Sequence, residues 1–157
     1  MIYIVTGGIN SGKTTKLLSL YREIKTGDGF ILPKLYIGDS YAGQQIVRLS
    51  TGEGRPFSLK KDFIPAFWNE QYRYDNYSFC REGFDFAFAS ICHIVDAGLS
   101  PIFIDEIGPL ELEEKGFYCL LSKLLEHDDT LYISVRELLI AQVISKFSIN
   151  NYTMLRA

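Results

Sequence analysis

The start of the chain combines a short apolar run, a glycine-rich turn and a helical stripe. The apolar run spans Ile2 to Val5 and has the length of a buried strand. After the turn, apolar residues return at the spacing of one helix face, at Leu17, Leu18, Tyr21 and Ile24. The pattern therefore predicts a strand, a loop and a helix between Met1 and Lys25.

Residues 27–77 follow a different pattern, in which short β-prone pieces alternate with glycine-containing turns. These pieces are Phe30 to Leu32, Leu35 to Ile37, Ile46 to Leu49 and Pro56 to Leu59. We interpret the segment as antiparallel hairpins inserted after the first strand and helix. Because aromatic side chains mostly fill cores, we expect its aromatics to pack the hairpins onto the sheet rather than to cover a ligand. They are Phe57, Phe63, Phe67, Trp68, Tyr72, Tyr74 and Tyr77.

From Phe84 onwards, helical stripes alternate with apolar strands. The stripes are Phe84, Phe88, Ile91 and Val95; Phe117, Leu120, Leu121, Leu124 and Leu125; and Ile140, Val143, Ile144 and Phe147. The strands are Ile102 to Ile104, Leu131 to Val135 and Tyr152 to Leu155. Such alternation is typical of right-handed βαβ units. The predicted fold is α/β, with three layers, a mostly parallel sheet, helices on both faces and the hairpin insert at 27–77.

Composition favours a single domain over residues 1–157, because a 47% hydrophobic content supplies a core. The net charge of −3 is spread without long blocks of one sign, which argues against a nucleic-acid partner. No run approaches the roughly 18 apolar residues of a membrane span, and no basic leader is present. The odd number of cysteines and the lack of C-x-x-C spacing predict buried free thiols in a reducing cytoplasm, at Cys80, Cys92 and Cys119.

The glycine-rich turn matches the phosphate-binding pattern G-x-x-x-x-G-K-[ST] in full, between a strand and a helix. In this P-loop, or Walker A motif, backbone N–H groups and the helix N-terminus attract phosphate oxygens. Lys13 would bridge the β- and γ-phosphates, and the Thr14 hydroxyl would bind Mg²⁺. Ser11 and Thr15 can add contacts at the rim. The predicted nucleotide-binding residues are Gly7, Gly8, Ile9, Asn10, Ser11, Gly12, Lys13, Thr14 and Thr15.

Two adjacent acids follow the apolar strand that starts at Pro101. A carboxylate at the end of a neighbouring strand is what a P-loop enzyme uses as its second Mg²⁺ anchor, as in a Walker B motif, so Asp105 is assigned to the metal as its outer-shell acid. If the strand ends at Asp105, Glu106 can turn toward the γ-phosphate and activate a water molecule. Glu111 follows a Gly-Pro turn, and several roles are open to it: holding the loop, pairing with an arginine, facing the ligand, or capping the next helix at the surface.

Charge on a transferring phosphate favours a nearby arginine. The available residues are Arg48, Arg55, Arg73, Arg81 and Arg136. Arg55 sits on a predicted hairpin tip, and Arg136 directly follows a strand, at the edge where α/β sheets bind ligands. The two histidines, His93 and His127, have no partner spacing and receive no chemical role.

Over nearly its whole length the chain resembles the small P-loop nucleoside-triphosphatases of the THEP1 type. The resemblance is carried by the P-loop, by Tyr77-x-Phe79 followed by Phe84-Asp85, and by Ile104 to Gly108 with Glu111-Leu112. It implies a RecA-like fold of the additional-strand branch. It also implies Mg²⁺-dependent hydrolysis of nucleoside triphosphates such as ATP or GTP to diphosphate and phosphate, with broad base tolerance. The family roles fall on Lys13, Thr14, Asp105 and Glu106.

Two other functions fit a P-loop protein of this size. A small-molecule or nucleoside kinase would use the hairpins as an acceptor pocket, and it would need an arginine-rich lid that excludes water. A nucleotide-dependent switch would hydrolyse only to change its affinity for a partner. The acid pair favours the hydrolase, because a water-activating glutamate beside the metal aspartate is the arrangement expected of one. The oligomeric state stays open.

Overall fold

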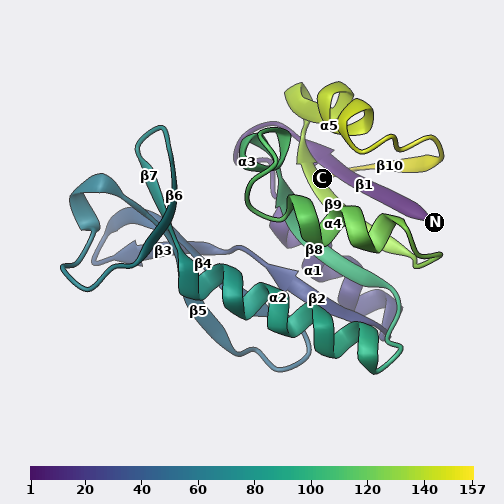
Figure 1. Ribbon diagram of the computed structural model, residues 1–157, viewed down its shortest axis with the longest axis horizontal. Helices are drawn as coiled ribbons and strands as arrows, with labels where there is room; N and C mark the ends of the chain where they lie inside the picture. Colours follow the sequence, from purple (N-terminus) through teal and green to yellow (C-terminus); the bar gives the residue numbers. More distant parts are fainter.

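The computed structural model describes all residues from 1 to 157, and every strand joins one sheet (Figure 1). The strands lie side by side in the order β10-β1-β9-β8-β2-β4-β5-β7-β6, and β3 pairs with β4. Their bounds are β1 Ile2–Gly7, β2 Asp28–Ile31, β3 Lys34–Ile37, β4 Ser40–Arg48, β5 Gly54–Lys60, β6 Glu70–Tyr74, β7 Tyr77–Cys80, β8 Ile102–Ile107, β9 Leu131–Arg136 and β10 Tyr152–Arg156.

The part of the sheet from β10 to β2 is parallel throughout. Strand β9 lies between β1, which leads into the P-loop, and β8, which carries Asp105. Strand β9, between the P-loop strand and the strand that carries Asp105, is the additional strand of the RecA-like arrangement. The carboxyl ends of β1, β8 and β9 therefore meet at one edge, where open α/β sheets bind their ligands.

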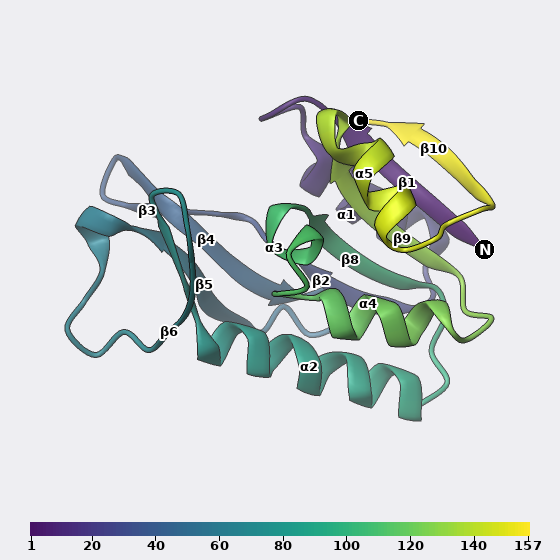
Figure 2. The same ribbon diagram turned by 45° about the horizontal axis from the view of Figure 1, so that its top comes forward.

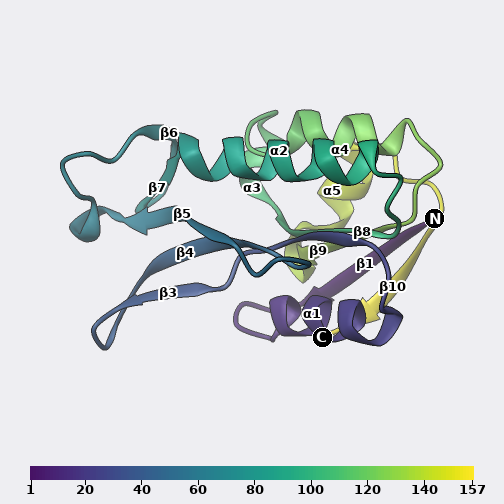
Figure 3. The same cartoon turned by 90° about the horizontal axis from the view of Figure 1, so that it is seen from below.

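Helices cover both faces of the parallel part, as the sequence predicts. Their bounds are α1 Lys13–Ile24, α2 Arg81–Asp96, α3 Pro109–Leu112, α4 Tyr118–Leu125 and α5 Ile140–Lys146, with short 3₁₀ turns at Lys61–Phe63 and Glu137–Leu139. Figure 3 shows α1 alone on one face and α2, α4 and α5 on the other. On the first face Leu17 packs with Val5 and Phe103, and on the second face Leu121 belongs to the larger core.

The hairpins from β3 to β7 extend the sheet to one side, away from the two termini (Figure 2). Their pairings are antiparallel, as expected. The first piece, β2, pairs antiparallel with β4 as expected, but it also pairs in parallel with β8 and so belongs to the central sheet and not to the insert alone. Gly29 permits this pairing, since a Cβ there would lie 2.0 Å from the Phe103 carbonyl oxygen. The excursion also runs past its expected end, because β7 continues to Cys80.

Two predictions about burial need correction. Cys80 is buried, but Cys92 and Cys119 are exposed, because each lies on the outward face of its helix. Among the hairpin aromatics Phe57 is buried, as expected, whereas Phe67 is 88% exposed. No helix of the fold combines the length and hydrophobicity that crossing a membrane requires.

Candidate functional site

The P-loop connects the end of β1 to the start of α1 at the carboxyl edge of the sheet. Its backbone is left-handed at Asn10, with φ of 58°, and at Gly12, with φ of 87°. A glycine takes the second conformation without strain. The turn directs the N-terminus of α1 into a cleft of about 690 Å³, which suits an anion. Residues 9–15 line this cleft, while Gly7 is buried at the end of β1.

The Lys13 side chain folds over its own loop. Its ammonium group donates hydrogen bonds to the carbonyl oxygens of Gly8, at 2.7 Å, and of Gly7, at 3.4 Å. Burial lowers the pKa of Lys13, and the nearby Arg136 acts in the same direction, whereas the Glu106 and Asp105 carboxylates oppose the shift. The Lys13 ammonium group therefore lies close enough to the carboxylates of Asp105 and Glu106 for their charges to act on it.

Asp105 is fully buried and joins β8 to three other parts of the fold. Its Oδ2 accepts hydrogen bonds from the Thr14 hydroxyl at 2.7 Å and from the Leu32 backbone N–H at 2.9 Å. Its Oδ1 accepts the Ser134 hydroxyl proton. The two residues assigned to the metal, Thr14 and Asp105, therefore lie in direct contact.

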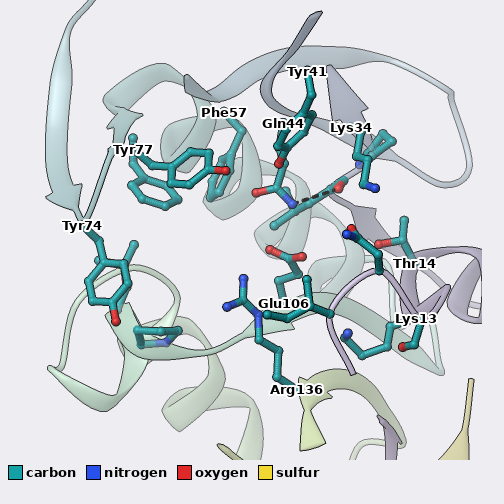
Figure 4. A pocket seen from close by; sticks show the side chains of 18 of the residues that line it. Lys13, Thr14, Lys34, Tyr41, Gln44, Phe57, Tyr74, Tyr77, Glu106 and Arg136 are labelled. Carbon is teal, nitrogen blue, oxygen red and sulfur yellow. Dashed lines mark hydrogen bonds between the residues drawn. The ribbon is translucent and has the colours of Figure 1, made fainter. Parts of the chain in front are cut away.

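Glu106 reaches the cleft through a bulge, and not because the strand ends. Strand β8 continues to Ile107, but its pairing with β9 shifts between Ile104 and Ile107. At the shift Glu106 has φ of 56°, a left-handed conformation that is uncommon for non-glycine residues. The bulge turns its carboxylate into the cleft, next to Arg136 and Gln44 (Figure 4).

The surroundings of Glu106 favour its protonated form. Burial raises the pKa of Glu106, and the negative charge of Asp105 raises it further. Gln44, Arg136 and Lys13 oppose that shift by stabilising the carboxylate. A carboxyl group with a raised pKa is a stronger base than an ordinary glutamate once it has lost its proton.

The structure separates the five candidate arginines. Arg136 ends β9 directly beside Gly7 of β1, and it lines the cleft. The others lie in ion pairs elsewhere: Arg48 with Asp28 at 2.8 Å, Arg55 with Glu53 at 2.7 Å, Arg73 with Glu70 at 2.9 Å and Arg81 with Asp85 at 3.7 Å. His93, which has no predicted role, contacts Arg48 through Nδ1 at 3.0 Å. Only Arg136 of the five is placed to meet a phosphate in the cleft.

Glu111 holds the loop that follows β8. It is 3% exposed, and its two carboxyl oxygens accept the backbone N–H groups of Gly108 and Phe117, each at 2.9 Å. Burial raises the pKa of Glu111 to about 7 in spite of these hydrogen bonds. The structure therefore shows the loop-holding role, and Glu111 also lines the cleft.

The opposite side of the cleft contains side chains that sequence reasoning assigned to packing. Tyr74 and Tyr77 line the cleft, and so do Tyr41 and Gln44 of β4, which the sequence did not single out. Figure 4 shows Glu106 between these side chains and the P-loop. The tyrosine content of the hairpins is the one sequence signal for such side chains, but it does not tell which tyrosines face the cleft.

The donor atoms suit Mg²⁺. This ion usually takes one or two carboxylates, together with waters and phosphate oxygens, in place of a cage of protein ligands. Thr14 lines the cleft and offers its hydroxyl there, while Asp105 is fully buried directly behind it and accepts that hydroxyl's proton, as an outer-shell acid would. No cluster of three or more His, Cys, Asp or Glu side chains exists elsewhere in the fold that could hold a metal. The residues present thus fit an ion shared with a triphosphate.

Comparisons with known proteins agree with this geometry. A family model described as NTPase matches residues 2–154. Two solved structures match 99% of this chain: a human cancer-related nucleoside triphosphatase, 21% identical over 87% of its own length with a TM-score of 0.67, and THEP1 from the hyperthermophile Aquifex aeolicus, 18% identical over 89% with a TM-score of 0.64. At these identities the two structures show a shared fold. No curated protein matches the chain. Because the family model covers nearly the whole sequence, the chain belongs to the NTPase family of the THEP1 type and is a nucleoside-triphosphate hydrolase.

Proposed function

We propose that this hydrolase is Mg²⁺-dependent, accepts nucleoside triphosphates with different bases, and uses Glu106 to activate the attacking water. The observation that carries the proposal is the contact between Thr14 and Asp105, 2.7 Å apart, beside the P-loop lysine and next to a glutamate turned into the cleft by a bulge. Every one of these groups addresses the phosphates and none addresses the base. Broad base tolerance follows from that division.

Each residue has a separate task in this proposal. The P-loop amides and Lys13 bind the triphosphate, with Lys13 leaving its loop carbonyl for the β- and γ-phosphate oxygens. Thr14 and Asp105 would hold Mg²⁺, which neutralises charge on the β- and γ-phosphates. Glu106 accepts a proton from the attacking water. Arg136 balances the charge on the γ-phosphate.

The hydrolase fits the cleft better than a kinase does. A kinase lid needs arginines that can move over the acceptor. Four of the five candidate arginines are engaged in ion pairs outside the cleft, and no other arginine lines it. Water beside Glu106 is therefore the expected acceptor in the basal reaction.

The test is phosphate release from ATP, GTP, CTP and UTP, with Mg²⁺ and with a chelator. We expect all four to be hydrolysed at rates within about ten-fold of one another, because no residue of the proposed mechanism contacts the base. A ten-fold difference in rate corresponds to about 1.4 kcal/mol. We expect no release under chelation. Hydrolysis restricted to one base, or undiminished turnover without Mg²⁺, would contradict the proposal. Lys13→Ala serves as the control for contaminating phosphatases.

A further inference from the structure

The cleft continues beyond Glu106, on the side opposite the P-loop (Figure 4). The whole cleft, P-loop side included, has a volume of about 690 Å³, within the range of roughly 300–1,000 Å³ typical of small-molecule sites. Four tyrosines from the antiparallel part of the sheet line the cleft: Tyr36, Tyr41, Tyr74 and Tyr77. We name the last three the tyrosine wall. Phe57 and Phe117 add apolar surface beside them.

The tyrosine wall carries the chemistry of a site for a planar heteroaromatic ring. Aromatic side chains stack on such rings, and phenol hydroxyls can bond to their polar edges. Burial raises the pKa of Tyr41, and the neighbouring Tyr77 hydroxyl adds to the shift, so the Tyr41 hydroxyl stays a proton donor. Asp75, an exposed residue at the turn between β6 and β7, also lines the cleft. Its carboxylate could accept an amino or ring N–H group.

With the triphosphate in the P-loop, the base of the hydrolysed nucleotide would point away from this wall. In a P-loop the lysine reaches the β- and γ-phosphates, and the backbone cradles the α- and β-phosphates. A triphosphate held in this way would place its γ-phosphate toward Glu106, and Figure 4 shows Tyr74 and Tyr77 on the side of Glu106 away from Lys13 and Thr14. An in-line attacking group enters from that side, opposite the leaving diphosphate. A ring on the wall therefore belongs to a second molecule.

We propose that the tyrosine wall binds a second, nucleoside-like molecule next to the γ-phosphate, at a site separate from that of the hydrolysed nucleotide. The inference rests on the proposed function in one respect, because it takes the triphosphate to lie in the P-loop. The occupant would displace water from Glu106. Hydrolysis should then slow at saturating triphosphate, with a lower kcat and an unchanged KM.

Direct binding provides the main test. Adenosine, guanosine, cytidine and uridine are titrated by calorimetry into the free protein and into protein saturated with ADP and Mg²⁺. We expect at least one nucleoside to bind with similar affinity in both titrations. Binding that disappears in the ADP-saturated protein would place the nucleoside in the nucleotide's own base site and overturn the proposal. Absence of binding by all four nucleosides would overturn it as well.

Variants locate the site. Tyr74→Ala should weaken nucleoside binding about ten-fold or more, since stacking on an aromatic ring is lost. Phe67→Ala is the matched control, because Phe67 is an aromatic of the same excursion that is 88% exposed and does not line the cleft. Equal losses in both variants would overturn the assignment. If nucleosides bind ADP-saturated protein but no triphosphate is hydrolysed, the proposed function fails while the second site stands.

Discussion

The hydroxyl oxygen of Ser134 accepts the backbone N–H of Glu106 at 2.8 Å. The same hydroxyl donates its proton to Oδ1 of Asp105. One fully buried side chain on β9 therefore holds both acids of β8, the one assigned to the metal and the one assigned to water. It also accommodates the bulge, because it supplies the partner that the Glu106 N–H lacks once the regular pairing shifts.

Ser134→Ala should impair catalysis and stability together. It leaves a buried N–H and a buried carboxylate oxygen without partners, at a cost of about 1–3 kcal/mol each in unfolding free energy. Misplacing the acids should lower kcat by roughly ten-fold to a hundred-fold, and the Mg²⁺ concentration needed for half-maximal rate should rise. Denaturant titrations and Mg²⁺ titrations of turnover measure these effects. Ser90→Ala, which changes a buried serine on α2 away from the acids, is the control. An unchanged kcat in Ser134→Ala would mean that Ser134 has a structural role only.

Glu106→Gln should separate binding from turnover. Loss of a general base lowers rates by about 10²- to 10⁴-fold, while nucleotide affinity should stay within a few-fold, because the amide keeps the size of the side chain. Single-turnover phosphate release and equilibrium nucleotide binding provide the two measurements. Glu113→Gln removes an exposed acid of the neighbouring loop and should change neither quantity. Full turnover in Glu106→Gln would remove Glu106 from the mechanism.

Arg136→Ala should reduce kcat by roughly 10²- to 10³-fold, the usual effect of removing one donor from a developing oxyanion. Arg136→Lys should recover part of the loss, since it retains the charge without the planar fork. Steady-state kinetics on both variants give the comparison. Arg73→Ala is matched to them, because Arg73 pairs with Glu70 at the surface and lies outside the cleft. A fall in affinity alone would mean that Arg136 binds the ground state only.

The sequence predicts the P-loop and the parallel part of the fold because both have local signals. Lys13 and Thr14 lie in a continuous motif, and Asp105 follows an apolar strand. Arg136 could be proposed but not chosen, since its choice depends on the ion pairs that occupy the other arginines. The sequence does not say which acid each of these arginines contacts, because that depends on how the chain folds.

Features that depend on strand pairing could not be read from the sequence. The turn residues around β2 suggest a hairpin, yet its parallel pairing with β8 depends on contact across 70 or so residues of chain. The bulge at Glu106 depends on Ser134, which lies on another strand. The tyrosine wall was missed for a related reason, because a tyrosine that faces a cleft and one that packs in a core have the same local pattern.

The buried carboxyl group of Glu111 should make stability depend on pH. Its pKa is about 7 in the folded protein and 4.5 ordinarily, so between these values the folded state holds the proton more tightly than the unfolded state does. The stabilisation is complete below pH 4.5 and is lost as the pH rises through 7. At 1.36 kcal/mol per pKa unit, the loss amounts to roughly 3 kcal/mol.

Chemical denaturation of wild type and Glu111→Gln from pH 4.5 to 8 isolates this contribution. The glutamine accepts only one of the two backbone N–H groups, from Gly108 and Phe117, that the carboxylate accepts. That defect shifts the variant's stability by a constant amount at every pH, because an amide does not titrate. The difference between wild type and variant should therefore fall by roughly 3 kcal/mol across the window, whatever its starting value. Parallel curves would mean that Glu111 is already ionised at pH 4.5, and that its two N–H partners outweigh its burial.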